Sequence, residues 1–179
     1  MHKHSDPFIL DVRSHFMGSH GQILIADDDP DFVVLFQIAL KNAGFSNDVQ
    51  VASTGAELMD YLEGRGEYAD RKAHPMPALA FIDLKLPFRH GFEVLRWIRN
   101  QPELNDLIVV IMSGFSFANE AEVAHDLGAN AFLAKPTRFG SLVEVLKQYR
   151  EEWCPAGPTA PALPAPERES EVVAAGQDR

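Results

Sequence analysis

Five short apolar runs, each followed by a turn and an amphipathic stretch, constrain the fold of this chain more than any other feature. Nearly continuous apolar runs are typical of strands that are buried on both faces of a parallel sheet. Because crossovers between parallel strands are right-handed, the repeat predicts an α/β fold: a doubly wound five-stranded parallel sheet with helices on both faces. We expect the strands at residues 22–26, 48–52, 78–82, 107–112 and 131–133.

Helix signals lie between these runs. The first helix is predicted to begin at Pro30 behind an Asp29 cap and to end at Gly44. Thr54 and Glu57 have the spacing of a capping box at the start of the second helix. The first helix is predicted to turn one face inward, formed by Phe32, Leu35, Phe36 and Ala39. The remaining helices are expected at about 91–100, 118–127 and 141–152.

The two ends of the chain differ in composition from the part between them. Residues 1–20 hold four of the 7 histidines, and residues 154–179 hold five of the 12 prolines among small and charged residues. Such segments bury too little apolar surface to offset their ordering entropy. We therefore predict a flexible extension at 1–20, a folded domain at 21–153 and a disordered Pro-rich tail at 154–179.

Charge and cysteine content limit the expected partners and compartment. The formal net charge of −10 argues against a nucleic-acid-binding surface, which normally needs clustered Lys and Arg. Cys154 is the only cysteine of the chain, so a reducing cytoplasm is the expected setting. No apolar run approaches the roughly 18 residues of a membrane span. A cytoplasmic protein that contacts neither membrane nor nucleic acid is expected.

Chemically reactive side chains follow four of the five predicted strands. Asp27 and Asp28 follow the first strand, Asp83 the third, Ser113 the fourth, and Lys135 the fifth. Because the carboxyl ends of parallel strands meet at one edge of a sheet, we expect these side chains to converge there. Each of them alone could be an ordinary cap or loop residue, but their order along consecutive strands favours a single site.

Three carboxylates in one place repel one another and favour a bound cation. Mg²⁺ prefers a few carboxylates together with water and a phosphate oxygen. A carboxylate can attack phosphorus to form an aspartyl phosphate, while a lysine and a metal neutralise the transferred group. A serine hydroxyl can then donate a hydrogen bond to the phosphate. The pattern therefore predicts Mg²⁺-dependent phosphoryl chemistry.

Over roughly residues 21–150 the sequence resembles the receiver domain of two-component response regulators. The resemblance is carried by Ile23–Pro30, Phe81–Pro87 with the following Gly91, Ile111–Gly114 and Phe132–Pro136. It implies a flavodoxin-like strand order, 2-1-3-4-5, and a stand-alone receiver that signals through protein contacts. The connection Gly64–Pro77 is similar to that of stand-alone regulators paired with bacterial phytochrome kinases.

The resemblance implies roles for the acidic residues and for the metal. Asp83 would be the phosphoacceptor, charged by a sensor histidine kinase. Asp28 and Asp83 would bind Mg²⁺ directly together with the backbone carbonyl of Lys85, and Asp27 would act through a water.

The resemblance also implies a phosphate ligand and a switch. Lys135 would pair with the phosphate, beside a cis peptide bond before Pro136. Ser113, Gly114 and Phe132 would form the switch that responds to the phosphate. The output would pass to a downstream protein or a phosphotransfer protein. A homodimer through the last two helices is a further alternative. The protein would be no enzyme beyond catalysing its own phosphorylation and dephosphorylation.

Three other functions fit parts of the sequence. A haloacid-dehalogenase-type phosphatase would use Asp27-Asp28-Asp29 as its Asp-x-Asp motif, with Ser113 and Lys135 as later elements, but it gives Asp83 no role. A flavodoxin-like nucleotide binder needs a Ser/Thr/Gly-rich phosphate loop after the first strand, where this chain has acids. The third alternative is a receiver that serves as an interaction module without being phosphorylated.

Overall fold

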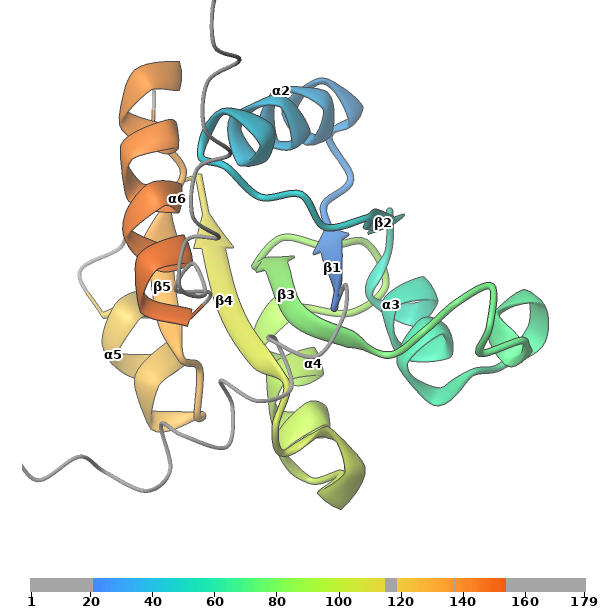
Figure 1. Ribbon diagram of the computed structural model, residues 1–179. Helices are drawn as coiled ribbons and strands as arrows, with labels where there is room; N and C mark the ends of the chain where they lie inside the picture. The colour runs from blue at the N-terminus through green and yellow to red at the C-terminus, as the bar shows by residue number, and fades with distance from the viewer. Residues whose placement is uncertain (1–20, 115–118, 137, 154–179) are drawn as a thin grey trace, which may run out of the picture.

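A computed structural model describes residues 21–114, 119–136 and 138–153, and within them five parallel strands form one sheet (Figure 1). The strands are β1 (Gln22–Ala26), β2 (Val49–Ala52), β3 (Pro77–Asp83), β4 (Ile108–Ser113) and β5 (Ala131–Ala134). Their order in the sheet is β2-β1-β3-β4-β5. The predicted fold class and strand order are confirmed, and the strand ends differ from the predicted ones by no more than one residue.

The central strands send alternate side chains into two hydrophobic cores. Ile23 and Ile25 of β1 enter one core, whereas Leu24 and Ala26 enter the other. The same alternation holds along β3 and β4. Full burial of a large apolar side chain stabilises the fold by roughly 1.5–3 kcal/mol. Because both faces of the sheet carry such side chains, both are covered by helices. This two-sided burial is the reason why the apolar runs are continuous instead of alternating.

Helices cover the two faces of the sheet separately (Figure 1). Two of them, α2 (Pro30–Asn42) and α6 (Phe139–Trp153), pack on the core that contains Ile23. The other three, α3 (Gly55–Glu63), α4 (Gly91–Arg99) and α5 (Glu120–Asp126), pack on the core that contains Leu24. Two short 3-10 helices, η1 (Gly66–Ala69) and η2 (Pro102–Leu104), precede β3 and β4.

The ends of α2 match the prediction, but its buried face does so only in part. Asp29 caps the helix by accepting hydrogen bonds from the backbone N–H groups of Asp31 and Phe32, at 3.0 and 3.1 Å. Beyond the other end Gly44 has a φ of 89°, which glycine adopts without strain. Leu35 was predicted to face inward, yet it is 40% exposed. The buried residues are Val33, Phe36, Ala39 and Leu40.

The geometry of the helix explains this error. Successive residues are 100° apart, so Leu35 lies about 200° from Val33 around the axis. When Val33 and Phe36 point toward the sheet, Leu35 therefore has to point toward solvent.

The predicted capping box of α3 forms in part. The backbone N–H of Glu57 donates to Thr54 Oγ1 at 3.0 Å, as expected. The Glu57 carboxylate, however, accepts from the backbone N–H of Ser53, at 2.8 Å. The capping box would have placed it on the N–H of Thr54.

The long connection between α3 and β3 is tied to the end of α3. Arg71 donates to the carbonyl oxygens of Tyr61 and Leu62 at 2.8 and 2.6 Å, so it adds side-chain donors to carbonyl groups in the last turn of the helix. The Tyr68 hydroxyl donates to Glu57 at 3.0 Å. Burial and the neighbouring Glu57 carboxylate raise the pKa of Tyr68 to about 12, so this hydrogen bond persists throughout the physiological pH range.

Some predictions concern residues outside those described. The predicted extension at 1–20, the predicted tail at 154–179 and the first residue of the helix expected at 118–127 belong to this group. Among the helices that are described, none has the length and apolar character needed to cross a membrane.

Candidate functional site

The carboxyl ends of β1 and β3 and the residue after β5 bring three charged side chains together. Lys135 Nζ lies 2.6 Å from Asp27 Oδ2 and 2.6 Å from Asp83 Oδ1. The side chains of Lys135, Asp27 and Asp83 are only 17%, 1% and 7% exposed. The parallel register causes this meeting, because it pairs Ala26 with Ile82 and so places the residue after β1 beside the end of β3. A nearly buried ion triad results.

Tight turns fix the orientation of both carboxylates. Asp27 Oδ1 accepts a hydrogen bond from the backbone N–H of Asp29 at 3.1 Å, and Asp83 Oδ2 accepts one from the backbone N–H of Lys85 at 2.6 Å. Each carboxylate therefore has one oxygen on Lys135 and the other on an N–H group two residues further along the chain. This local pattern is typical of aspartate at the start of a turn.

Gly91 packs closely against the backbone of the turn that carries Asp83. Its backbone N–H donates to the carbonyl oxygen of Leu84 at 3.0 Å. A Cβ atom at this position would lie 2.5 Å from the carbonyl oxygen of Asp83, closer than real Cβ contacts come. A side chain here therefore has to displace the backbone of the turn that carries Asp83.

We expect Gly91→Ala to lower the free energy of unfolding by about 1–3 kcal/mol, because the clash is with backbone atoms that cannot rotate away. Urea denaturation followed by circular dichroism measures the change. Gly140→Ala is the matched control, since nothing lies within 4 Å of a Cβ added to Gly140 of α6. That control should leave the stability unchanged or slightly raised. Equal stability of the two variants would show that the turn after β3 shifts at little cost.

The triad carries two negative charges and one positive charge. Burial raises the pKa of Asp27, although Lys135 and the N–H of Asp29 favour its ionised form. Burial alone would lower the pKa of Lys135, but its hydrogen bonds to Asp27 and Asp83 and their charges outweigh that effect and raise it. Lys135 is thus held in its charged form, and one negative charge remains without a matching cation in the triad.

Ser113 links β4 to the triad through its backbone. Its carbonyl oxygen accepts from the backbone N–H of Lys135 at 2.7 Å, and its side chain is buried. The Ser113 hydroxyl donates to Glu120 Oε2 at 2.8 Å. Glu120 was not among the predicted site residues. It is the first residue of α5, where acidic side chains are common because they stabilise a helix, so no pattern in the sequence singles it out.

Phe32 is a second residue of the site that the sequence interpretation assigned to the core alone. Its ring centroid lies 4.3 Å from Lys135 Nζ, within the range of a cation–π interaction. The ammonium group of Lys135 therefore contacts two carboxylates and one aromatic face. Phe32 lies partly buried in the first turn of α2, and from this position its ring reaches Lys135. Helical periodicity does not reveal such a contact.

The other predicted residues lie around the triad without joining it. Asp28 is exposed, as are Gly114 and the side chain of Lys85. Phe132 is half-buried and packs against the core beneath α3, α4 and α5. The peptide bond between Lys135 and Pro136 is trans, so the predicted cis bond was wrong. Trans is the lower-energy isomer even before proline.

Convergence of all three carboxylates was predicted, but the structure brings only two of them together. Among the described residues, no group of three His, Cys, Asp or Glu side chains is placed to hold a metal ion, since Asp28 points to solvent. The chemistry of the donors still fits Mg²⁺. Asp27 and Asp83 are oxygen donors with an uncompensated negative charge, which a hard divalent cation prefers.

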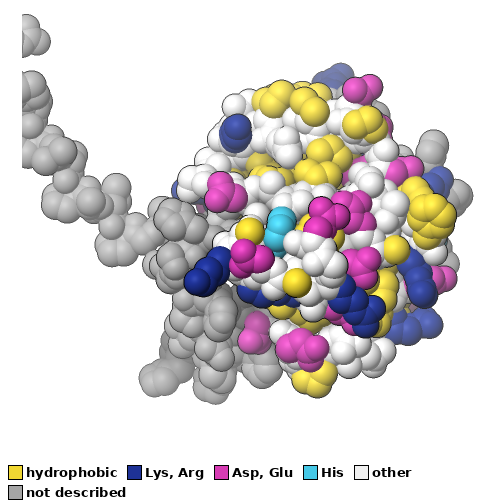
Figure 2. Space-filling model, turned by 90° about the vertical axis from the view of Figure 1, so that its right-hand side faces the viewer, with side chains coloured by type: hydrophobic (Ala, Val, Ile, Leu, Met, Phe, Trp, Pro, Cys, Tyr) yellow, Lys and Arg dark blue, Asp and Glu magenta, His cyan; other side chains and the backbone are white. Residues whose placement is uncertain are grey.

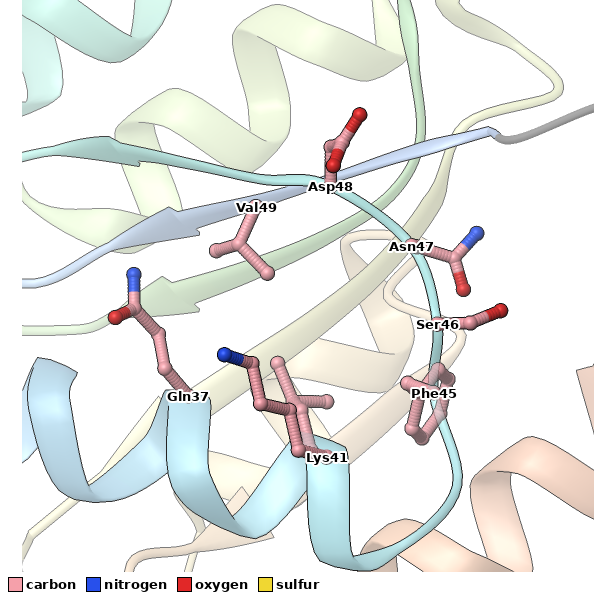
Figure 3. A pocket seen from close by; sticks show the side chains of 8 residues that line it. Gln37, Lys41, Phe45, Ser46, Asn47, Asp48 and Val49 are labelled. Carbon is pink, nitrogen blue, oxygen red and sulfur yellow. The ribbon is translucent and has the colours of Figure 1, made fainter.

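A pocket of about 410 Å³ lies away from the triad, between the C-terminal half of α2 and the start of β2 (Figure 3). Figure 3 shows Gln37 and Lys41 extending from the helix on the side where Val49 begins the strand. Because β2 starts here, the pocket is at the amino edge of the sheet, opposite the edge with the triad. Its lining contains none of the predicted site residues and consists of Gln37, Leu40, Lys41, Phe45, Ser46, Asn47, Asp48 and Val49.

With this geometry in place, comparison with known proteins identifies the family. Residues 23–147 match the family model of the response regulator receiver domain. The chain belongs to this family. Its relatives include the response regulator Rcp1 of Synechocystis sp., which is 27% identical over 131 residues that cover 73% of this chain and 87% of Rcp1.

Solved structures of similar receiver domains share the fold. A response regulator in red light signaling of R. palustris is 30% identical, with a TM-score of 0.71 over 78% of this chain and 99% of that protein. The phosphorylated cyanobacterial phytochrome response regulator RcpA is 31% identical, with a TM-score of 0.68 over 75% of this chain and 94% of RcpA. Rcp1 has been crystallised in a Mn²⁺-bound form, with a TM-score of 0.66 to this receiver domain at 26% identity over 74% of this chain and 94% of that one.

Proposed function

We propose that this receiver domain accepts a phosphoryl group on Asp83 from a sensor histidine kinase, in a reaction that requires Mg²⁺. One observation carries the proposal: Asp83 is a nearly buried carboxylate held 2.6 Å from an ammonium group beside a second carboxylate. Such a site provides a nucleophile, a cation for the transferred group and an excess of negative charge that recruits a metal. A cytoplasmic location goes with this function, because ATP-dependent kinases work there.

The residues of the triad have separate tasks in the transfer. An Asp83 oxygen attacks phosphorus, the new O–P bond forms, and the N–P bond to the phosphohistidine of the kinase breaks. The backbone N–H of Lys85 keeps the other Asp83 oxygen in place. Lys135 moves from Asp83 to an oxygen of the phosphoryl group, because its flexible stem allows a short displacement. The ammonium group then neutralises negative charge on the oxygens of the transferred phosphoryl group.

The metal would be held by Asp27, Asp28, Asp83 and the backbone carbonyl of Lys85, with Asp27 acting through a water. When it is bound, Mg²⁺ neutralises charge on the phosphoryl oxygens during the transfer. The uncompensated charge of the triad supports this assignment. The Mn²⁺-bound form of the relative Rcp1 supports binding of a divalent cation.

Ser113, Gly114 and Phe132 would respond to the bound phosphate. The Ser113 hydroxyl donates to the phosphate, the small Gly114 leaves space beside it, and the Phe132 ring moves inward behind the hydroxyl. The altered surface of α5 and α6 would then bind a downstream protein, a phosphotransfer protein or a second copy of the chain. A nucleic-acid partner is not expected, because the net charge is −10 and Figure 2 shows acidic and basic side chains interspersed on the visible face.

An apolar surface on α2 is suited to contact the kinase. Val34, Leu35 and Ile38 are 57%, 40% and 49% exposed, on the helix that begins directly after the three acidic residues that follow β1. Figure 2 shows hydrophobic side chains near the top of the molecule, at the height of α2 in Figure 1. A kinase that presents its phosphohistidine to Asp83 has to approach this edge of the sheet. Exposed apolar residues in such a place are typical of a binding surface.

We expect Val34→Asp to slow phosphoryl transfer from a bacterial phytochrome kinase by more than about tenfold, because a charge is placed in an apolar interface. Labelling by acetyl phosphate should be unchanged, since a small donor needs no docking surface. Met76→Asp is the matched control: Met76 is 42% exposed but precedes β3 at the opposite edge of the sheet. If both variants accept phosphoryl groups from the kinase at the wild-type rate, α2 is not the docking surface.

The phosphatase alternative loses support at Asp29. That function needs the first and third aspartates of the Asp-x-Asp motif for chemistry, whereas Asp29 accepts the hydrogen bonds that cap α2. Its carboxylate is exposed and separate from the triad. The nucleotide-binding alternative is disfavoured because acids, not a Ser/Thr/Gly-rich phosphate loop, follow β1. Without a metal, the carboxylates of Asp27 and Asp83 would repel a phosphate at this edge.

Chemical labelling tests the proposed function. Incubation with acetyl phosphate and Mg²⁺ should add one phosphoryl group that is lost in base and in hydroxylamine, as an acyl phosphate is. Borohydride reduction and peptide mass spectrometry should map the modification to Asp83. A protein that takes up no phosphoryl group from either acetyl phosphate or a kinase would instead be a receiver that acts as an interaction module.

A further inference from the structure

The hydroxyl that is proposed to bind the phosphate is already donating to a carboxylate. Ser113 Oγ lies 2.8 Å from Glu120 Oε2, and the Ser113 side chain is buried at the end of β4. We propose that Glu120 is a resting-state latch: it holds Ser113 away from the phosphate position, and phosphorylation of Asp83 breaks this contact and thereby releases the start of α5. The inference rests on the proposed function and adds a positioning residue to it.

The Ser113 hydroxyl has to change its acceptor when the phosphate arrives. A serine hydroxyl has one proton to donate. It cannot give a full hydrogen bond to Glu120 and to a phosphate oxygen at the same time. Switching of Ser113 therefore requires that the bond to Glu120 be broken. Since hydrogen bonds to charged acceptors are stronger than those to neutral ones, Glu120 makes the resting arrangement more favourable than a neutral residue would.

The helix that carries Glu120 is short and weakly anchored. Glu120 is the first residue of α5, and this helix has only seven residues, of which Ala124 alone is buried. Asn119 gives it no side-chain cap. The contact with Ser113 thus ties a weakly anchored helix to β4. Loss of the contact changes the restraint on α5 itself, which biases an existing equilibrium of this helix rather than building a new surface.

Affinity for beryllofluoride in the presence of Mg²⁺ tests the latch, because this complex mimics the phosphoryl group at Asp83. We expect Glu120→Gln to raise the affinity measured by calorimetry about tenfold, the usual difference between hydrogen bonds to charged and to neutral acceptors. Glu122→Gln is the matched control. It removes an equal charge from an exposed position of the same turn and should change the affinity less than about twofold, because exposed charges are screened.

A double-mutant cycle separates the latch from a general charge effect. In a Ser113→Ala background, Glu120→Gln should give no gain in affinity, since the hydroxyl through which Glu120 acts is missing. A gain of the same size in both backgrounds would overturn the proposal, as would an unchanged affinity of Glu120→Gln alone. If the wild-type protein binds no beryllofluoride at all, the proposed function fails as well, so the two failures are distinguishable.

Hydrogen exchange gives a second readout that needs no activity. The backbone N–H of Val123 donates to the carbonyl oxygen of Asn119 in the first turn of α5. In wild-type protein, beryllofluoride should increase the exchange rate of this turn. In Glu120→Gln the rate should already be raised without ligand and should change little on its addition. Identical exchange in the free wild-type and Glu120→Gln proteins would count against release of α5.

Discussion

Replacing Asp83 by asparagine is expected to abolish phosphoryl labelling by acetyl phosphate or a kinase. The amide oxygen of asparagine is a poor nucleophile, and no stable acyl phosphate can form on it. The fold should survive, because the neutral side chain can still accept from the N–H of Lys85, and Lys135 keeps its ion pair with Asp27 at 2.6 Å. Mass spectrometry of the intact protein measures the labelling, and circular dichroism checks the fold.

Asp27→Asn is the matched comparison for this experiment. Asp27 is as deeply buried as Asp83 and contacts the same ammonium group, so the two substitutions perturb the charge of the triad equally. In a receiver, Asp27→Asn should slow labelling without moving it from Asp83. Labelling that survives in Asp83→Asn and disappears in Asp27→Asn would instead support the phosphatase alternative.

The fold and the two buried carboxylates could be predicted because local patterns determine them. Five continuous apolar runs leave few arrangements other than a covered parallel sheet, and its topology places the residues after β1 and β3 side by side. Asp27 and Asp83 are the residues that end these runs. The meeting of their side chains with Lys135 therefore follows from strand order alone.

What the sequence did not reveal depends on side-chain directions and on contacts between distant turns. Asp27 and Asp28 are adjacent, yet Asp27 is buried and Asp28 is exposed to solvent. Glu120 and Phe32 reach the site from the first turns of two helices, and no spacing rule connects them with Ser113 or Lys135. Leu35 was misplaced because helix α2 has apolar residues on more than one face, which leaves its rotation undetermined.

Removal of Lys135 should separate the chemistry of the phosphoryl group from the binding of the metal. We expect Lys135→Ala to slow phosphorylation by acetyl phosphate about a hundredfold or more, the usual cost of removing one stabilising group from a developing anion. Its Mg²⁺ affinity, measured by isothermal titration calorimetry, should be kept or increased. The reason is that the ammonium group lies 2.6 Å from both buried carboxylates and competes with a cation for them.

Asp28→Ala should behave in the opposite way, although Asp28 is exposed and does not contact the triad. As a proposed direct ligand it should lower the Mg²⁺ affinity at least about tenfold and slow phosphorylation only through that loss, so that high Mg²⁺ concentrations restore much of the rate. Asp31→Ala is the matched control, since it removes a nearby exposed carboxylate with no proposed metal role. Equal losses of Mg²⁺ affinity in Lys135→Ala and Asp28→Ala would mean that the lysine is part of the metal site. An unchanged affinity in Asp28→Ala would mean that the two buried carboxylates bind the cation without it.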